Sequence, residues 1–411
     1  PPRAAATLRR PTRGWAGARV RIGDGGLVVR CASPTRRVRL VAGASHLDGG
    51  LVVRCASSSR RVRLVAGASL GGGTRGWAGA RARIGDGGLV VRFASSSRRV
   101  RLVARCRRVT VDMRVSVGSV ELSSPIMTAS GTAGYGRELA RYLDLDELGA
   151  VVTKSIAPYP WPGNPAPRLH PTPLGMINAV GLQGPGVAAW LRDELPPLVE
   201  AGATVVCSIW GRSIDDYRAA ADALGAAPAE VVAVEVNLSC PNLEGRGSIF
   251  AHDPALSADV VAATAGCGRA RWAKLSPNTD RIVEVAQAVG AAGAEAVTLV
   301  NTLLGLVIDP DTWRPALGNG GGGVSGRAIH PIAVRAVADV RAALPDLPIV
   351  GVGGVATGWD AAELMLVGAS AVQVGTATFA EPAACARIGR ELAGLAADRG
   401  IPRIADLIGV V

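Results

Sequence analysis

The stretch VEVNLSCPN at residues 234–242 places a cysteine among polar side chains directly after an apolar run. Such a run is typical of a strand buried on both faces. A cysteine that only fills a core is inert, whereas a thiol in a polar loop serves as a nucleophile or a proton-transferring base. Asn237 and Asn242 flank Cys240 with amides suited to a planar polar ring. Both interpretations of Cys240 stay open at this level.

The chain has two lysines, Lys154 and Lys274, among 45 basic residues. Arginine stands wherever a solvated positive charge suffices, so the lysines mark places where a compact ammonium group is needed. Each lies at the end of an apolar run. Chance survival in a biased composition is the alternative explanation, and the shared position argues against it.

Glycine-rich loops follow two later apolar runs, as GVGGVATG at 351–358 and VGTATF at 374–379. Backbone N–H groups of such loops surround a phosphate without obstruction by side chains. A phosphorylated cofactor is implied, and lysines nearby would stabilise negative charge on its ring.

These residues need a scaffold that brings strand ends together, and the sequence predicts a (β/α)8 TIM barrel. Apolar β-type runs alternate with Ala- and Leu-rich helical stretches such as 214–224, 280–293, 330–344 and 359–368. A doubly wound open sheet is the alternative fold. The eight runs expected as strands are 126–130, 151–155, 204–209, 231–237, 271–275, 296–301, 348–353 and 371–375.

The unusual residues all lie at the carboxyl ends of these runs, which is where barrel active sites are built. They are Ser130, Gly131, Lys154, Ser155, Asn237, Lys274, Asn301, Thr302, Gly353, Gly354, Gly375 and Thr376.

Residues 1–112 differ from the rest in charge and in pattern. They hold 24 Arg, no Lys and 4 Asp, so they carry +20 and the remaining residues carry −8 of the net +12. Blocks such as GLVVRCAS and RRVRLVA recur almost letter for letter at irregular spacing, whereas solenoid repeats keep their period. With Met113 the first methionine, we interpret 1–112 as a disordered tail or an over-extended start. A nucleic-acid-binding arm and a small β-rich module are the alternatives.

Seven scattered cysteines form no CxxC pair and have no histidine at metal-ligand spacing, which argues against a zinc or iron–sulfur site held by this chain. Free thiols and no signal peptide favour the cytoplasm. No stretch approaches the ~20 apolar residues of a membrane helix.

Beyond the local patterns, residues 113 to about 399 resemble the class 1 dihydroorotate dehydrogenases, flavin enzymes of pyrimidine (UMP) biosynthesis. The resemblance rests on PIMTASGTAGYG, GAVVTKSI, GNPAPRL, GMINAVGLQGPG, VEVNLSCPN, AKLSPNTD, NTLLGLVID, GGGGVSGRAIHPIAVR, VGVGGVATGWDA and GASAVQVGTATF. NTLLGLVID and KLSPN are similar to subclass 1B, whose catalytic subunit works with a partner subunit that carries FAD and a 2Fe-2S cluster and links to NAD. The domain expected is 113–411.

The resemblance implies a role for each matched residue. Cys240 would be the general base that takes a proton from dihydroorotate while hydride leaves for FMN. Residues implied to hold the substrate are Lys154, Asn178, Ala179, Val180, Gly181, Leu182, Asn237, Asn301 and Thr302. Residues implied to hold FMN are Ser130, Lys154, Ser155, Ser208, Asn237, Lys274, Val300, Gly326, Gly353, Gly354, Gly375 and Thr376.

Two positions depart from the family pattern. Ser208 and Gly184 stand where the family usually has asparagine, so the flavin contact at Ser208 is expected to differ. The nearest rival is a dihydropyrimidine dehydrogenase-like enzyme acting on uracil or thymine. That family tends to follow SCP with histidine, and Asn242 favours orotate. The rival of another class is a nucleic-acid-binding protein led by its Arg-rich arm, whose binding would depend on salt and vanish without 1–112.

Overall fold

The computed structural model describes residues 110–239 and 249–411 in full, together with the backbone of strands between residues 16 and 104. The chain divides into two compact units. One comprises Val111–Ala396 with Pro402–Val411, and the other comprises Pro1–Thr110 with Ala397–Ile401.

The larger unit is built on a sheet of eight parallel strands, which confirms the predicted barrel. The order in the sheet is β10-β21-β20-β17-β16-β15-β14-β11. The strands are β10 (Ile126–Thr128), β11 (Val151–Val152), β14 (Val205–Ile209), β15 (Val231–Asn237), β16 (Ala270–Lys274), β17 (Ala296–Leu299), β20 (Ile349–Val352) and β21 (Ala371–Val374). Each coincides with one of the eight expected runs.

The first and last strands of this sheet meet and close the barrel. Met127 forms a parallel bridge with Ala150, and Gly149 N–H donates to the Ile126 carbonyl at 2.8 Å. Almost every strand residue is buried, as expected for a parallel sheet covered by helices. This arrangement explains why the strands read as continuous apolar runs.

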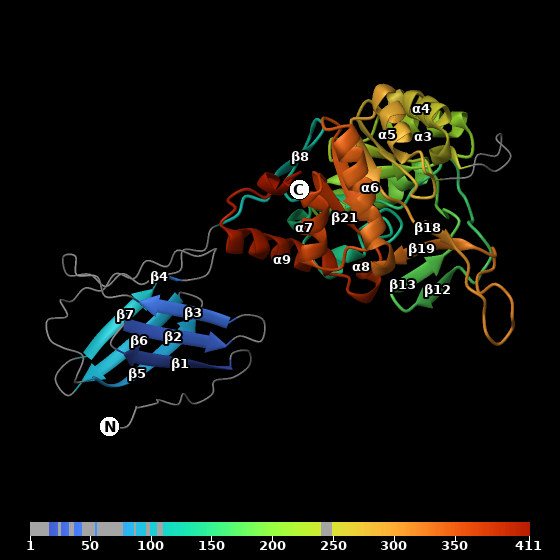
Figure 1. Cartoon of the computed structure of the whole chain (residues 1–411). Coiled ribbons are helices and arrows are strands. Elements are labelled where there is room, and N and C mark those ends of the chain that lie inside the picture. The colour runs from blue at the N-terminus through green and yellow to red at the C-terminus, as the bar shows by residue number, and fades with distance from the viewer. Residues whose placement is uncertain are drawn as a thin grey trace. The chain divides into compact units, whose positions relative to one another are not determined.

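Helices surround the barrel, and α3 to α7 lie in sequence order around it (Figure 1). The positions of α3, α5, α6 and α7 agree with the four helical stretches named from the sequence. The helices are α1 (Val187–Ala189), α2 (Leu195–Glu200), α3 (Ile214–Leu224), α4 (Pro254–Ala263), α5 (Ile282–Ala291), α6 (His330–Ala343), α7 (Gly358–Leu366), α8 (Ala377–Ala380) and α9 (Ala384–Arg399). None in the described part of the chain is long and apolar enough to cross a membrane.

Local sequence fixes where several helices begin. Ser213 caps α3 by accepting from Asp216 N–H, and Thr357 with Asp360 forms a reciprocal capping box at α7. These caps satisfy N–H groups that have no partner inside the helix.

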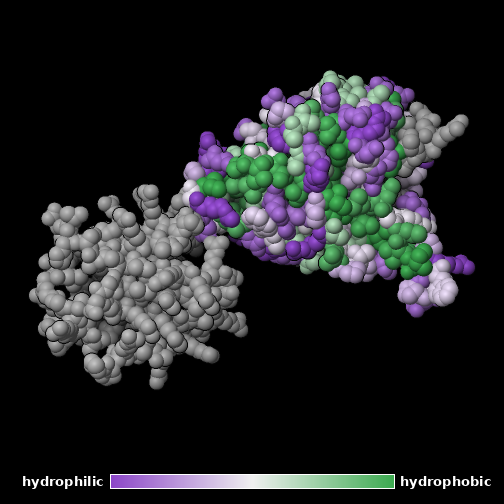
Figure 2. Space-filling view, in the orientation of Figure 1, coloured by the Kyte–Doolittle hydropathy of each residue, from purple (hydrophilic) through white to green (hydrophobic). Residues whose placement is uncertain are grey.

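A second, antiparallel sheet was not expected from the sequence. It has the order β12-β13-β19-β18, with β12 (Leu169–Thr172), β13 (Gly175–Asn178), β18 (Leu303–Gly305) and β19 (Gly322–Gly326). Figure 2 shows hydrophobic surface in this region, and Leu169, Leu174, Leu304, Leu306, Ile308 and Trp313 are exposed there. A short hairpin of β8 (Val115–Val117) and β9 (Val120–Leu122) precedes the barrel.

The smaller unit contains two antiparallel sheets made from the repeated blocks. Their strands are β1 (Ala16–Gly23), β2 (Gly26–Ala32), β3 (Arg37–Ala42) and β4 (Arg54–Cys55), then β5 (Trp77–Gly85), β6 (Gly88–Ser95) and β7 (Arg99–Ala104). Val29 pairs with Leu40 as Val91 pairs with Leu102, so the copies share one register. The alternative of a small β-rich module stays a prediction. Whether residues 1–112 are dispensable stays a prediction.

Candidate active site

Hydroxyl and amide side chains from four strand ends form one connected chain at the carboxyl end of the barrel. Ser208 Oγ lies 2.8 Å from Ser155 Oγ, and Asn237 Nδ2 donates to Ser155 Oγ at 3.2 Å. Asn301 Nδ2 donates to Asn237 Oδ1 at 3.2 Å, and Asn301 Oδ1 accepts from Thr302 N–H at 2.8 Å. The structure therefore brings together five of the residues predicted from the sequence, including Ser208 at the departure from the family pattern.

Lys274 lies in a buried polar network inside the barrel. Its Nζ donates to Ser130 Oγ at 2.9 Å and to Gln373 Oε1 at 3.2 Å, and it lies 3.4 Å from Glu235 Oε1. Gln373 Nε2 in turn donates to Glu235 Oε2 at 2.6 Å. Because a buried ammonium is tolerated only with compensating partners, this network fixes the position of Lys274.

Lys154 follows β11 and is partly buried. Its backbone N–H donates to the Gly134 carbonyl at 2.9 Å. Burial, and secondly the positive charge of Arg168, hold the pKa of Lys154 below its usual range. A negatively charged ligand beside Nζ would offset both effects, so this position suits an anion.

Residues 178–182, which the sequence predicts to hold the substrate, begin at the end of β13 in the antiparallel sheet. Asn178, the last residue of β13, donates from Nδ2 to the Gly323 carbonyl at 3.1 Å. Asn164 holds the next residues by donating from Nδ2 to the Ala179 carbonyl and from its N–H to the Val180 carbonyl, both at 3.1 Å. Gly181 accepts from Trp161, while Leu182 packs with Trp161 against Ala157 and Trp210. Leu182 therefore anchors residues 179–182 to this apolar cluster.

The glycines after β20 and β21 present backbone donors. Among residues 110–239 and 249–411, the N–H groups of Gly353, Gly354, Gly375 and Thr376 have no backbone acceptor. Gly354 has φ +69°, and a Cβ there would lie 2.7 Å from His330 Cβ, so only glycine fits. Unused N–H donors at two neighbouring strand ends are what a phosphate group requires.

We call the loops at residues 353–354 and 375–376 the glycine cradle. Gly326, Ser325 and Val300 lie next to it. Gly326 ends β19 with φ +99°, and a Cβ on Gly354 would lie 2.8 Å from its carbonyl oxygen. Thr376 Oγ1 donates to Ser325 Oγ at 2.8 Å, which ties the loop after β21 to β19. Val300 is buried after β17, and its N–H donates to the Val352 carbonyl at 2.8 Å.

Cys240 belongs to residues 240–248, which lie outside the described residues. The chain enters this segment directly from the site, because Asn237 Oδ1 accepts from Ser239 N–H at 3.2 Å. The described thiols are unsuited to chemistry, since burial raises the pKa of Cys207 and of Cys385 to about 12 and also raises that of Cys267. Inert thiols of this kind leave Cys240 as the candidate in the barrel.

Sequence reasoning missed Glu235 and Gln373. Both are fully buried, and both point into the barrel interior beside Lys274. The available signal was a single polar residue inside each of two otherwise apolar strands, VVAVEVN and AVQV. In a strand buried on both faces, such a residue needs a partner that sequence alone does not identify.

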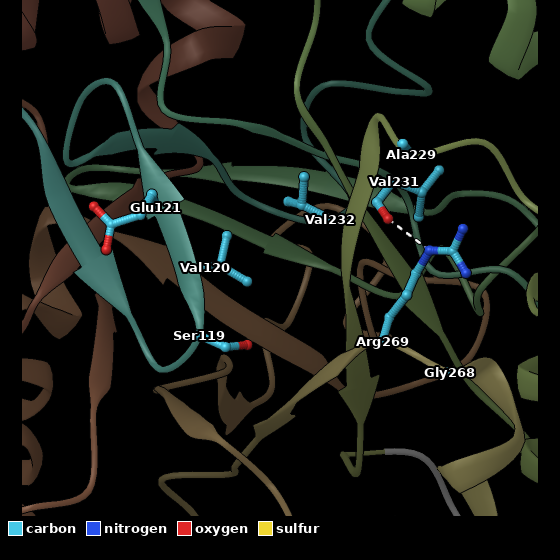
Figure 3. A pocket seen from close by; sticks show the side chains of 8 residues that line it. All are labelled: Ser119, Val120, Glu121, Ala229, Val231, Val232, Gly268 and Arg269. Atoms are coloured by element: carbon cyan, nitrogen blue, oxygen red, sulfur yellow. Dashed lines mark hydrogen bonds between the residues drawn. The ribbon is translucent and has the colours of Figure 1, made fainter.

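A separate pocket lies at the opposite end of the barrel strands (Figure 3). Ser119, Val120 and Glu121 of the β8–β9 hairpin line one side, and Val231 and Arg269 line the other. Arg269 Nε donates to the carbonyl of Val231, the first residue of β15, at 2.6 Å. The predicted site residues lie at the carboxyl ends of the strands, so this pocket lies apart from the candidate active site.

Comparison with known proteins bears on the site as a whole. The sequence model of the dihydroorotate dehydrogenase family matches residues 112–395. A protein of Trichlorobacter lovleyi named dihydroorotate dehydrogenase B (NAD(+)), catalytic subunit, is 46% identical over 300 residues, which are 73% of this chain and 98% of that protein. Proteins of the same name from Desulforudis audaxviator and Geobacter sp. (strain M21) are 46% and 44% identical over 300 and 301 residues, covering 73% of this chain and 97% and 98% of theirs.

The matched region coincides with the barrel unit and contains every predicted site residue. The polar chain at the strand ends, the glycine cradle and the order of motifs all fall within it. The resemblance to the class 1B catalytic subunits is confirmed, and the chain belongs to the dihydroorotate dehydrogenase family.

Proposed function

We propose that this protein oxidises dihydroorotate to orotate in pyrimidine biosynthesis, with FMN as its cofactor. The observation that carries this proposal is the chain of amide and hydroxyl groups from Ser155 to Thr302 beside the unused N–H groups after β20 and β21. The amide and hydroxyl groups suit a planar ring with alternating donors and acceptors, and the N–H groups suit a phosphate. Both lie on the face where barrel enzymes hold their substrates.

The residues of the site fit FMN. The backbone N–H groups of Gly353, Gly354, Gly375 and Thr376 would hold its phosphate. Two observations support this: these N–H groups have no backbone acceptor in the described part of the chain, and the glycines place no side chain beside them. When bound, FMN accepts the hydride that leaves the substrate carbon. Lys274, with its charge held in place by Glu235, would stabilise negative charge that develops on the flavin ring. The rest of the cofactor would contact Ser130, Lys154, Ser155, Ser208, Asn237, Val300 and Gly326.

The substrate would occupy the space beside Lys154 and the amides. Lys154 would pair with the substrate carboxylate, a group that uracil lacks. Asn178, Asn237 and Asn301 supply both donors and acceptors for the ring edges, and residues 179–182 with Thr302 complete the lining. This charge requirement is what favours dihydroorotate over a dihydropyrimidine without a carboxylate.

Cys240 would act as the base. Its thiolate would take the proton from the ring carbon beside the carbonyl, while hydride leaves from the neighbouring carbon. Asn237 and Ser239, at the end of β15, lead into residues 240–248, and this supports the role proposed for Cys240.

We further propose that electrons leave through a partner subunit that carries FAD and a 2Fe-2S cluster and reduces NAD, within a heterotetramer in the cytoplasm. The relatives' name, which includes the words catalytic subunit, supports a second subunit. The exposed apolar side chains on the antiparallel sheet support association with another protein chain, because patches of this kind mark interfaces.

A substrate-choice assay tests the proposal. The purified protein is mixed with an artificial electron acceptor and either dihydroorotate or dihydrouracil. We expect the acceptor to be reduced with dihydroorotate alone. Reduction with dihydrouracil at a comparable rate would instead identify the dihydropyrimidine dehydrogenase-like alternative.

A further inference from the structure

Three metal-ligating side chains converge outside the barrel, behind the loop that follows β20. His330 is the first residue of α6, and Asp360 and Glu363 lie one turn apart on α7. One ligand atom from each lies within 4.8 Å of the other two. Residues three apart on a helix share a face, which explains how both carboxylates reach the imidazole.

Hydrogen bonding fixes which nitrogen of His330 is free. Its Nδ1 lies 2.8 Å from the Gly353 carbonyl oxygen, and since a carbonyl only accepts, Nδ1 carries the proton and donates. In the neutral ring, Nε2 then holds a lone pair. Nε2 is buried and has no hydrogen-bond partner among residues 110–239 and 249–411. Glu363 Oε2 lies 3.4 Å from it, so a lone pair faces a carboxylate oxygen.

This juxtaposition is unfavourable unless a positive charge lies at Nε2. A proton on Nε2 would make a simple ion pair with Glu363, but the contact lacks hydrogen-bond geometry. A metal ion requires no direct contact between the two atoms. For bonds of about 2.0–2.1 Å in a tetrahedral zinc site, neighbouring N and O ligands are about 3.4 Å apart.

The surroundings of the three side chains also resemble those of metal ligands. A ligating histidine usually donates its second nitrogen to a carbonyl or carboxylate, as His330 does to Gly353. Asp360 Oδ2 accepts from Ala356 and Thr357 N–H at 2.9 and 2.8 Å, which orients the carboxylate. Glu363 is 37% exposed and opens the site to solvent.

We propose that His330, Asp360 and Glu363 bind a divalent ion of the zinc type, with water completing the coordination. The imidazole and carboxylate donors suit Zn²⁺ or Co²⁺. A bound ion would tie α6 to α7 and, through the Gly353 carbonyl, restrain the Gly353–Gly354 loop. It would therefore raise thermal stability, because it binds the folded chain. The inference is independent of dihydroorotate oxidation.

Metal binding by the full-length protein tests this site. After treatment with a chelator, the protein is titrated with ZnCl₂ by calorimetry and with CoCl₂ by absorbance. We expect one saturable site, cobalt d–d bands without a thiolate charge-transfer band, and a higher melting temperature with Zn²⁺. The variants are Glu363→Gln, which removes a half-exposed ligand with little effect on folding, and His330→Gln. His170→Gln on β12 is the matched control.

Each variant at the site should weaken binding by about 10-fold or more, and the control should bind as the wild type does. Circular dichroism checks that each variant is folded. The proposal is overturned if the wild type has no saturable site, or if either folded variant binds zinc as tightly as the wild type. Retained binding in Glu363→Gln would show that His330 and Glu363 form an ion pair only.

Discussion

At the scale of single residues, the role proposed for Cys240 as the base predicts that its replacement affects turnover but not flavin binding. The N–H donors after β20 and β21, and the Lys274 partners Ser130 and Gln373, belong to other strands, so a change at Cys240 leaves them intact. Cys240→Ala should therefore keep bound flavin and lower turnover by about 10²-fold or more at neutral pH.

Flavin absorbance and steady-state rates measure the two effects. Cys207→Ala is a suitable control, because burial raises the pKa of that thiol to about 12 and keeps it protonated. Near-normal turnover in Cys240→Ala would remove it as the base.

The charged side chain of Lys154 lowers the free energy of unfolding at neutral pH. Because its pKa is lowered in the folded chain from 10.5, charging Lys154 opposes folding. This penalty is complete below the folded pKa and disappears as the pH rises toward 10.5. Lys154→Met should thus be more stable than the wild type at pH 7, by an amount that shrinks as the pH approaches 10.5.

Urea unfolding at several pH values, without ligand, measures this difference. The same variant should lose about 10²-fold in activity, since a charge aimed at the substrate is removed. A variant that is less stable at pH 7, with no change in the difference at higher pH, would contradict this account of Lys154.

At the scale of elements, the polar network of Glu235, Lys274 and Gln373 connects β15, β16 and β21, and in the proposed function it also holds Lys274 beside the flavin. Glu235 is fully buried and Lys274 nearly so. Glu235→Ala leaves the ammonium without its counter-charge, so the free energy of unfolding should fall by about 3–5 kcal/mol.

Glu284→Ala, which breaks the exposed Arg281–Glu284 pair on α5, should cost less than about 1 kcal/mol. Denaturant unfolding of the flavin-free proteins compares the two. Equal losses would show that the buried pair has no special role.

The elements that the sequence predicted are those with a repeating pattern. All eight barrel strands read as apolar runs because both of their faces are buried, and α3, α5, α6 and α7 had clear helical stretches. The antiparallel sheet was missed because β12 contains Pro171 and β19 reads GGVSG, both typical of loops.

The candidate site was predictable only in part for a similar reason. Asn237, Lys274 and Gly353 stand out at strand ends, where polar residues interrupt an apolar pattern. Glu235 and His330 became visible only when the fold supplied their partners, because Gln373 and Glu363 are remote in sequence.

At the scale of the whole molecule, the barrel unit begins at Val111. Asp112 N–H donates to the Pro402 carbonyl at 2.8 Å, and Ile404 N–H donates to the Asp112 carbonyl at 2.8 Å. A shortened chain of residues 111–411 should fold and keep flavin and activity. A chain that begins at Met113 loses both bonds and should be less stable by about 1–3 kcal/mol.

Thermal unfolding and the artificial-acceptor assay compare both chains with the full-length protein. Loss of flavin or activity on removal of residues 1–110 would show that this segment is part of the enzyme. Equal stability of the two shortened chains would contradict the role given to Asp112.

The central claim is that dihydroorotate gives its hydride to a flavin held at the carboxyl end of the barrel. Anaerobic addition of dihydroorotate to the purified protein, followed by absorbance, tests it most directly. We predict a yellow protein whose flavin absorbance is bleached by dihydroorotate and unaffected by dihydrouracil. A folded protein without flavin, or flavin that dihydroorotate leaves oxidised, would contradict the claim.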